Sequence, residues 1–318
     1  MTDLEQKLLA IIQDAFPLEE RPYLVLAEQL GSDEQSVFAA VENLRQSGII
    51  RRIGGVYDSK KLGFISRLCA GKVPTVVTGA ADDNALEKFA AAVNEIPAIT
   101  HNYVRSHEYN VWFTVIAQSE EEIQKIVDDV CAKTELHDVH VLSATKKYKI
   151  NTVMGGVVRR ALQPCKIPAR ILSDSDRTRI HIACDDIPHS LTPFKDWGVS
   201  CEELREDLAL KRMRRFGAIL RHQEAGFAFN AMVCLAELDK SPNNSAGAIL
   251  AQKPFISHCY DRPAFEGFPY TLYAMMHAQS ADELDRNIKE AAESIGNPDY
   301  VVLHSVRELK KTSYRFFA

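Results

Sequence analysis

The segments IRRIGGVYDSKKLGF (50–64) and MRRFGAILRHQEAGF (213–227) share an Arg-Arg pair, the glycine that follows it and a closing Gly-Phe pair, at a constant offset of 163 residues. Two further pairs of segments repeat at similar offsets: HNYVR (101–105) with HCYDR (258–262), and AQSEEEIQKIVDDV (117–130) with AQSADELDRNIKEA (278–291). Offsets that change by a few residues are typical of loops of different length. The chain is therefore a tandem repeat, and each half is analysed as one copy.

Each copy ends in a unit in which strand and helix periodicities alternate. In the first copy the predicted elements are a strand (64–73), a helix (82–96), a hairpin (99–105 and 109–117), a second helix (119–133) and a last strand (137–150). The second helix opens with a Ser-x-x-Glu capping box. The order β-α-β-β-α-β predicts a ferredoxin-like domain.

The first fifty residues have a different pattern. Three short amphipathic segments are followed by IIRRIGGVYD (49–58), and this order predicts a winged helix-turn-helix with that segment as its wing. The second copy keeps Pro193, Phe194, Gly198 and the Arg-Arg-Phe-Gly run of the wing, but it lacks several residues, including about one turn of the third helix. The second helix-turn-helix is therefore predicted to be degenerate.

These patterns predict an α+β chain made of a tandem repeat of winged helix-turn-helix and ferredoxin-like domains. The predicted domains are a winged helix-turn-helix (1–60), a ferredoxin-like domain (61–150), a linker with Gly-Gly and two prolines (151–172), a degenerate helix-turn-helix (173–222) and a second ferredoxin-like domain (223–318).

Composition restricts the class of protein. With 318 residues, 46% hydrophobic and 25% charged, the chain has the composition of a globular protein. The formal net charge of −5 gives no general attraction to nucleic acid or anionic membranes. No apolar run is long enough to cross a bilayer, and the acidic amphipathic start is unlike a signal peptide, so we expect a cytoplasmic protein without a membrane partner. The seven scattered cysteines form no Cys-x-x-Cys pair and are expected to be reduced.

The third helix of the first copy is the candidate DNA-reading helix, and its charge has the wrong sign. It carries Asp33, Glu34 and Glu42 against the single Arg45. Neutralisation of phosphates supplies most of the affinity for DNA, so DNA is not an expected partner. We expect these helices to act as a scaffold instead.

A winged helix-turn-helix followed by a ferredoxin-like domain resembles the Lrp/AsnC regulators. The strings FPLEERPYLVLAEQLG, IIRRIGGVYD, RRFGAILRHQEAGF, HCYDRP and FPYTLYAMMH more specifically resemble the siroheme decarboxylases. In that family two unequal Lrp-like subunits form a heterodimer that removes the C12 and C18 acetate carboxyl groups of siroheme and gives 12,18-didecarboxysiroheme, in haem b or haem d1 biosynthesis. The resemblance implies a carboxy-lyase in which both subunits are fused and the halves pack as a pseudo-heterodimer, with further oligomers open.

The two His-x-Tyr-x-Arg segments suit that chemistry. Alternate residues of a strand share a face, and three such side chains cover roughly 13 Å, comparable to the width of a tetrapyrrole ring. Imidazole can ligate haem-type iron, guanidinium can grip a carboxylate at two points, and a phenol can donate a hydrogen bond. No cofactor is expected beyond the iron of the substrate, siroheme or didecarboxysiroheme, because the macrocycle itself can accept the electrons left by carbon dioxide.

The second half is expected to hold the main catalytic pocket, because Arg221 and His222 stand where the first half has Asp58 and Ser59. The predicted catalytic residues are His222, His258, Tyr260 and Arg262. The predicted substrate-binding residues are His101, Tyr103, Arg105, Tyr109, Arg215, Arg221 and Tyr270. His222 or His258 is the expected axial ligand to the substrate iron.

Other interpretations stay open at this level. The repeated His, Tyr and Arg can be inherited packing, the hairpin aromatics can be plain core, and the Met-Met-His run at 275–277 is interpreted as core. An alternative function is an Lrp/AsnC-type transcription regulator with a duplicated ligand-sensing domain. A third is a tetrapyrrole carrier without catalysis.

Overall fold

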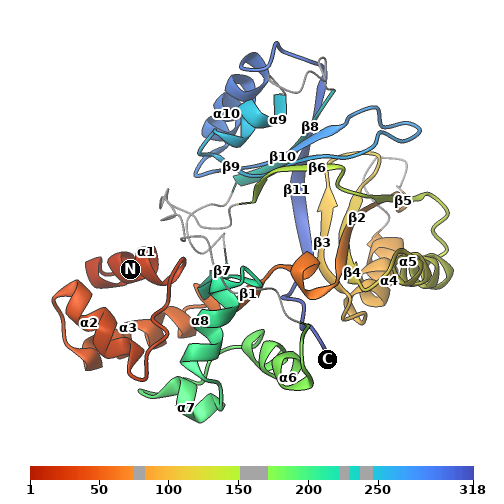
Figure 1. The fold of residues 1–318 in the computed structure, drawn as a ribbon. Coiled ribbons are helices and arrows are strands. Elements are labelled where there is room, and N and C mark those ends of the chain that lie inside the picture. The colour runs from red at the N-terminus through yellow and green to blue at the C-terminus, as the bar shows by residue number, and fades with distance from the viewer. Residues whose placement is uncertain (75–82, 151–170, 222–228, 237–245) are drawn as a thin grey trace. The chain divides into compact units, whose positions relative to one another are not determined.

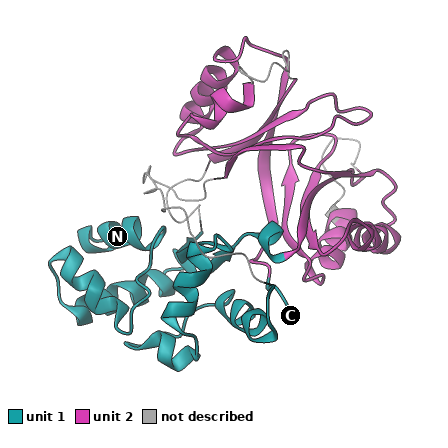
Figure 2. Ribbon diagram, in the orientation of Figure 1, with its two compact units in different colours: residues 1–62, 153–226, 315–318 teal, residues 63–152, 227–314 magenta. Residues whose placement is uncertain are grey.

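The computed structural model describes residues 1–74, 83–150, 171–221, 229–236 and 246–318. The chain divides into two compact units (Figure 2). Unit 1 consists of residues 1–62, 153–226 and 315–318, and unit 2 consists of residues 63–152 and 227–314. Each unit therefore contains one part from each half of the repeat.

Unit 1 combines both helical segments (Figure 1). Its elements are α1 (Asp3–Ile12), α2 (Pro22–Leu30), α3 (Glu34–Gln46), β1 (Ile50–Tyr57), η1 (Ser59–Leu62), α6 (Asp174–Ala183), α7 (Pro193–Trp197), α8 (Cys201–Ala209) and β7 (Met213–Leu220). Both α2 and α7 begin at a proline and end at a left-handed glycine, Gly31 or Gly198. The second copy is the degenerate one, because α7 has five residues against nine in α2, and α8 has nine against thirteen in α3.

The two segments expected to be separate wings pair with each other. Strands β1 and β7 are antiparallel, and the corresponding glycines Gly54 and Gly217 are direct partners. The two halves are thus related by a local twofold at this pair. A Cβ on Gly217 would lie 2.4 Å from the carbonyl oxygen of Ile12, and one on Gly54 would lie 2.3 Å from that of Asp185. Each strand therefore crosses closely over the end of the other half's first helix.

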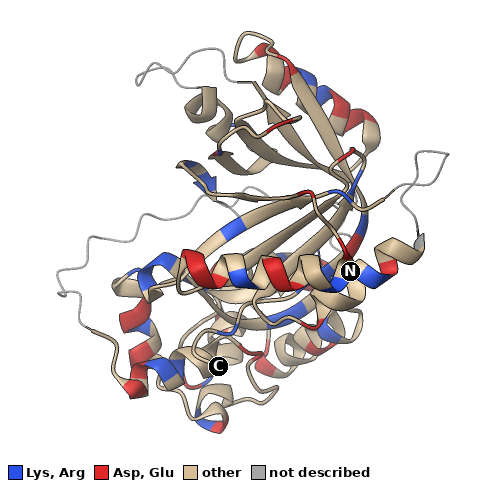
Figure 3. Cartoon of the chain, turned by 90° about the vertical axis from the view of Figure 1, so that its right-hand side faces the viewer, with Lys and Arg blue, Asp and Glu red and all other residues tan. Residues whose placement is uncertain are grey.

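Charged residues of both signs are interspersed along the helices (Figure 3). On α3, the single arginine Arg45 is ion-paired with Asp186 and also donates to the carbonyl oxygen of Ile187 at 3.3 Å. Within the described residues, no helix is long and apolar enough to cross a membrane.

Unit 2 contains both ferredoxin-like halves. The elements of the first half are β2 (Ile65–Gly71), α4 (Asp83–Asn94), β3 (Ile99–Arg105), β4 (Val111–Ala117), α5 (Glu120–Thr134), β5 (Val139–Leu142) and β6 (Lys146–Ile150). Those of the second half are β8 (Phe229–Leu235), α9 (Ala246–Ala251), β9 (Ile256–Asp261), β10 (Leu272–Ala278), α10 (Ala281–Glu293) and β11 (Tyr300–Lys311). The predicted order β-α-β-β-α-β is confirmed in both halves.

The two halves share a single nine-stranded sheet in the order β5-β2-β4-β3-β11-β8-β10-β9-β6. The segment 137–150, expected as one strand, divides in two: β5 pairs with β2 of its own half, and β6 pairs with β9 of the other half. Strand β11 does the same without a break, because Tyr300–His304 pair with β8 and Ser305–Lys311 pair with β3. Each half therefore donates the end of its last strand to the other.

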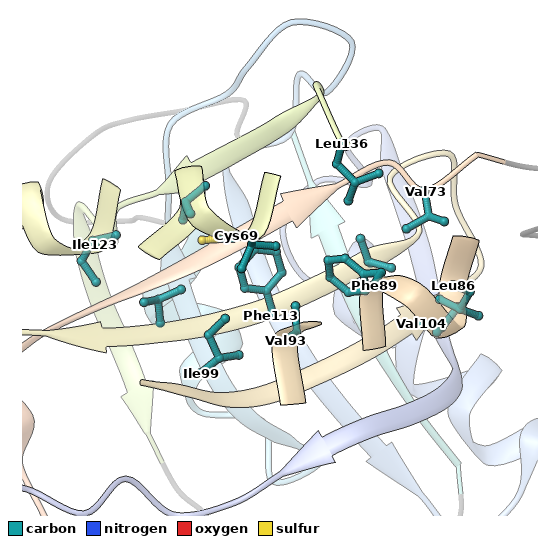
Figure 4. Packing of buried hydrophobic residues seen from close by; sticks show 14 of the residues in the cluster. Cys69, Val73, Leu86, Phe89, Val93, Ile99, Val104, Phe113, Ile123 and Leu136 are labelled. Carbon is teal, nitrogen blue, oxygen red and sulfur yellow. The ribbon is translucent and has the colours of Figure 1, made fainter. Parts of the chain in front are cut away.

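Three hydrophobic clusters of described residues lie in unit 2. One lies between the first-half strands and helices α4 and α5, where Phe89 and Phe113 are fully buried (Figure 4). A second cluster occupies the corresponding place in the second half. The third joins the opposite faces of the two halves, with members Ala70, Tyr109, Trp112, Leu142, Met232, Cys234, Phe268, Tyr273 and Leu303. The repeated His, Tyr and Arg residues lie on this third, helix-free face.

Candidate functional site

The two halves carry matching rows of side chains, here called the His-Tyr-Arg ladders. The first ladder is His101, Tyr103 and Arg105, and the second is His258, Tyr260 and Arg262. In the first, the His and Tyr rings lie 6.4 Å apart at 28°, and the guanidinium carbon of Arg105 lies 5.0 Å from the Tyr103 ring centre. In the second, the corresponding values are 6.2 Å, 23° and 5.2 Å. The structure therefore brings together the three residue types of each segment as the strand periodicity predicted.

A β-bulge next to each ladder histidine turns a hydroxyl toward its ring. The strand register skips Thr100 opposite β4 and Ser257 opposite β10. A β-bulge changes the direction of nearby side chains. A bulged residue can therefore point to the face of the sheet opposite to the one that regular alternation assigns. The hydroxyl oxygens of Thr100 and Ser257 each lie 2.9 Å from Nδ1 of the following histidine, His101 or His258.

The two ladder arginines reach across to the opposite half. Nη1 of Arg105 donates to the carbonyl oxygen of Leu303 at 3.2 Å and to Oγ of Ser305 at 2.8 Å. Nη1 of Arg262 donates to the carbonyl oxygen of Leu142 at 2.6 Å. Leu142 and Leu303 occupy corresponding places in the repeat, at an offset of 161 residues. The two contacts are therefore equivalent under the twofold relation of the halves.

Arg105 is buried and Arg262 is half-buried with a buried Nε atom, and both guanidinium groups lack an anionic partner within the described residues. Burial lowers the pKa of Arg105 and of Arg262. Within the described residues neither makes an ion pair with a carboxylate, and the Nε atom of each is buried without a hydrogen-bond acceptor. A buried cation without a counter-ion is costly, so this arrangement is suited to receive an anionic ligand.

Tyr273 lies at the centre of the second ladder. It pairs with Tyr260 across the strands, as Trp112 pairs with Tyr103 in the first half. Its ring centre lies 5.8 Å from the guanidinium carbon of Arg262, and burial raises the pKa of its hydroxyl. That hydroxyl is buried and has no hydrogen-bond partner among the described residues. The sequence left the hairpin aromatics open between ligand wall and core; the structure places Tyr273 in the third hydrophobic cluster, and its role as a ligand wall stays a prediction.

Cys234 joins the two ladders from within the third cluster. Its thiol is fully buried, and burial raises its pKa against the opposing effect of the nearby charges on Arg105 and Arg262. Both guanidinium groups therefore lie close enough to one thiol to influence it. The sequence offered no pattern that singled out this cysteine.

Tyr109 is held by protein contacts. Its hydroxyl lies 3.4 Å from Oδ1 of Asp138, 3.3 Å from Nε2 of His140 and 3.2 Å from the carbonyl oxygen of Glu266. Its ring packs edge-on against Phe265, and the side chain is 6% exposed. These contacts give Tyr109 a structural role, and its predicted contact with substrate gains no support from them.

Tyr270 packs edge-on against Phe268, with ring centres 5.0 Å apart, beside the same loop. Its predicted role in binding substrate stays a prediction. The loop itself, residues 263–269, is the longer hairpin turn of the second half, and its two phenylalanines stack on each other at 5.1 Å.

The remaining predicted site residues belong to unit 1. Arg215 is buried, and its Nη1 donates to the carbonyl oxygens of Gln13 and, at 3.1 Å, Ala218. Its counterpart in the repeat, Arg52, holds the carbonyl oxygens of Asp185 and Gly55 in the same way. These contacts give Arg215 a structural role. They lend no support to its predicted contact with substrate, which stays a prediction.

Arg221 is exposed, and its backbone N–H donates to the carbonyl oxygen of Ile49 at 3.0 Å. His222, predicted as a catalytic residue or iron ligand, lies outside the described residues. Among the residues that are described, no group of three or more His, Cys, Asp or Glu side chains could hold a metal ion. The predicted iron-ligand role of His222 or His258 therefore stays a prediction.

Comparison with known proteins gives two family matches. The AsnC-like ligand binding domain family matches residues 61–149 and 224–310. The siroheme decarboxylase NirDL-like HTH domain family matches residues 5–51. The fold and the two family matches thus define a duplicated Lrp/AsnC-type protein, and the paired ladders are its candidate ligand site.

Individual relatives identify the family within this class of proteins more specifically. A siroheme decarboxylase of Hydrogenobacter thermophilus is 33% identical over 98% of this chain and 94% of its own length. A siroheme decarboxylase alpha subunit of Desulfovibrio desulfuricans is 45% identical over 47% of this chain and 82% of its own. A beta subunit of Oleidesulfovibrio alaskensis is 36% identical over 47% of this chain and 99% of its own.

A solved structure agrees with these relatives. The crystal structure of the siroheme decarboxylase NirDL with an iron-uroporphyrin III analogue matches with a TM-score of 0.67 and 28% identity, over 99% of this chain and 95% of that one. This chain belongs to the siroheme decarboxylase family.

Proposed function

We propose that this chain removes the acetate carboxyl groups at C12 and C18 of siroheme and releases 12,18-didecarboxysiroheme. The observation that carries the proposal is the pair of guanidinium groups of Arg105 and Arg262, whose pKa is lowered by burial and which lack a carboxylate partner within the described residues. Siroheme is a polycarboxylate, and a guanidinium can hold one carboxylate through two parallel hydrogen bonds. Two matched ladders suit a substrate from which two acetate carboxyl groups are removed.

The ladders supply what a decarboxylation requires. When carbon dioxide leaves, the electron pair of the broken bond is delocalised into the macrocycle of the substrate, so no resident cofactor is needed. Arg262 holds a carboxylate of the substrate, and the aromatic rings around it exclude water, which strengthens this electrostatic contact. A histidine or tyrosine of the ladder then gives a proton to the carbon that has lost carbon dioxide.

The halves are proposed to act together as the two subunits of a heterodimer would. Relatives described as alpha and beta subunits each match about half of this chain. The shared sheet and the third hydrophobic cluster support this proposal, because each half completes the other's sheet and touches its ladder arginine. The second half is proposed to hold the main catalytic pocket.

The experiment is anaerobic mixing of the pure protein with siroheme, followed by measurement of carbon dioxide and of the product mass. We expect the loss of two carboxyl groups and a shifted absorption spectrum. The matched control is the double variant Arg105→Met and Arg262→Met, which should bind and convert much less substrate. A static spectral change without carbon dioxide would overturn the proposal in favour of a carrier.

DNA is not a proposed partner. Arg45 of α3 is ion-paired with Asp186, and the other charged residues of the helix, Glu34 and Glu42, are acidic. A gel shift that weakens steeply with salt would contradict this view, because neutralised phosphates make DNA binding salt-dependent. If that shift appeared together with no reaction on siroheme, a regulator would be the better interpretation.

A further inference from the structure

A chain of hydrogen bonds in the second half links two histidines through one hydroxyl. Oγ of Ser257 lies 2.9 Å from Nδ1 of His258 and 2.9 Å from Nε2 of His277. The same oxygen lies 3.3 Å from the carbonyl oxygen of Met275. The side chain of Ser257 is 8% exposed, so this contact is sheltered from water.

Strand geometry explains how the three residues meet. His277 and Met275 are alternate residues of β10, and Met275 pairs directly with His258 of β9, so all three side chains share one face. The bulge leaves Ser257 out of the pairing and turns its hydroxyl onto this face. Without the bulge, Ser257 would point toward the helix-covered side.

Ser257 has a single hydroxyl hydrogen for its three contacts, and this couples the tautomers of the two histidines. The hydroxyl has one hydrogen to donate, and the carbonyl oxygen of Met275 can only accept. At least one of the two ring nitrogens that face Ser257 must therefore carry a hydrogen and donate it. If His277 donates and the hydroxyl donates to His258, Nε2 of His258 carries the hydrogen. If His258 donates from Nδ1, its neutral ring has no hydrogen on Nε2.

The first half has the contact between hydroxyl and histidine but not the second histidine. Thr100 contacts Nδ1 of His101 at the same 2.9 Å, but Ile116 stands at the position that corresponds to His277. A second histidine that could supply a hydrogen through the hydroxyl is therefore a feature of the second half.

We propose that His277 and Ser257 form a proton relay that sets the hydrogen on His258 and makes the second ladder the proton-delivering one. This proposal rests on the proposed decarboxylation, and it excludes His258 as the axial iron ligand, because Nδ1 faces Ser257 and Nε2 carries the proton that is delivered. His258 gives its Nε2 proton to the carbon that has lost carbon dioxide, and the electron pair of the broken C–C bond forms the new C–H bond. At the same time Nδ1 of His258 takes the proton of Ser257, and Ser257 takes one from the His277 imidazolium, which becomes neutral.

The relay predicts a pattern of rates and affinities among variants that a purely structural role of these residues would not produce. His277→Ile copies the first half, and Ser257→Ala removes the hydroxyl. Each should lower the rate of single turnover at saturating siroheme by at least about tenfold, while the dissociation constant of siroheme changes less than about threefold. Ser257→Thr keeps the hydroxyl, as Thr100 does in the first half, and should retain most of the rate. Ile116→Ala is the matched control for a change on the same strand face in the first half.

A second measurement does not depend on activity. Nitrogen-15 NMR of labelled histidines, without substrate, should show a different tautomer of His258 in Ser257→Ala than in the wild type and in Ser257→Thr. If Ser257→Ala keeps both the wild-type tautomer and the wild-type rate, the relay is wrong. If the wild type itself releases no carbon dioxide, the proposed function fails, whereas the tautomer result still decides whether the hydrogen bonds couple the two rings.

Discussion

At the scale of single residues, the unusual feature is a pair of arginines, one buried and one half-buried, that no carboxylate neutralises within the described part of the chain. Arg105 and Arg262 donate to backbone carbonyls of the opposite half, and burial lowers the pKa of both. Proteins rarely keep such groups buried for stability, because an apolar side chain of similar volume is often as good or better. Their retention is more simply explained by a ligand that carries the missing negative charge.

The first prediction separates stability from function at Arg262. Arg262→Met should leave the free energy of unfolding within about 1 kcal/mol of the wild type, because the relieved burial of a charge offsets the lost hydrogen bond to Leu142. The same change should lower the rate of decarboxylation at least about a hundredfold, by analogy with the loss of other positioned groups. Arg105→Met should cost about tenfold in rate, because the second half is proposed to hold the main pocket. Chemical denaturation and single-turnover assays give the two quantities, and a large loss of stability with normal turnover would reverse the interpretation.

The second prediction concerns Tyr109, whose hydroxyl meets Asp138, His140 and the loop carbonyl of Glu266. Tyr109→Phe should destabilise the protein by about 1 kcal/mol, the usual worth of such hydrogen bonds, and should leave the affinity for siroheme within about threefold. Denaturant titration and spectroscopic titration with siroheme measure the two. His140→Gln serves as the matched control on the same network. A tenfold loss of affinity for siroheme in folded Tyr109→Phe would show instead that Tyr109 contributes to substrate binding.

Much of the site at this scale follows from the sequence, because strand alternation fixes which residues share a face. That rule placed both ladders. It could not find Ser257, since a bulge reverses the face that alternation assigns, and it could not find His277, whose partner lies on another strand. The carbonyls of Leu142 and Leu303 could not be predicted either, because each comes from the half opposite its arginine, and no sequence pattern singled out Cys234.

At the scale of elements, the repeat and the element order were predictable, and the exchange of strands was not. The sequence predicts one strand over residues 137–150, but such a pattern says nothing about which strand is the partner. In the structure Val139–Leu142 pair with β2 and Lys146–Ile150 pair with β9. Pairing across the halves depends on tertiary contacts, which a local pattern does not contain.

The third prediction tests the crossing of β7 over α1. Gly217→Ala would bring a Cβ within 2.4 Å of the carbonyl oxygen of Ile12, where backbone atoms cannot give way. We expect a loss of about 1 to 3 kcal/mol, the cost of overpacking a close contact. Gly54→Ala should behave alike, since the corresponding distance to Asp185 is 2.3 Å.

The control for this crossing is Gly31→Ala. Gly31 has a φ of +63° and nothing within 4 Å of an added Cβ, so it reports only the backbone cost of a left-handed residue, about 1 kcal/mol. Thermal unfolding of the three variants measures the differences. Equal stability of Gly217→Ala and the wild type would mean that β7 does not pass so close to α1.

At the scale of the whole molecule, each compact unit is built from both halves. In unit 1 the halves meet at the β1–β7 pair. In unit 2 they meet where β11 pairs with β3 and where β6 pairs with β9. The helix-free faces also share a hydrophobic cluster that includes Trp112 and Tyr273, whose rings lie 6.3 Å apart. Two halves joined in this way resemble two subunits whose association no longer depends on concentration.

The fourth prediction follows from this arrangement. If the chain is cut at a protease site inserted between residues 151 and 170, the two pieces should stay together and elute at the mass of the intact 35.6 kDa chain. They should also keep the decarboxylation activity, because each ladder arginine still finds its carbonyl partner on the other piece. Size-exclusion chromatography with light scattering after cleavage measures the first expectation, and the siroheme assay measures the second. A control piece that ends at residue 143 lacks β6, loses the pairing with β9, and should associate more weakly. Separation of the full pieces at micromolar concentration would show that the strand exchange does not hold the halves together, and that the covalent link is what unites them.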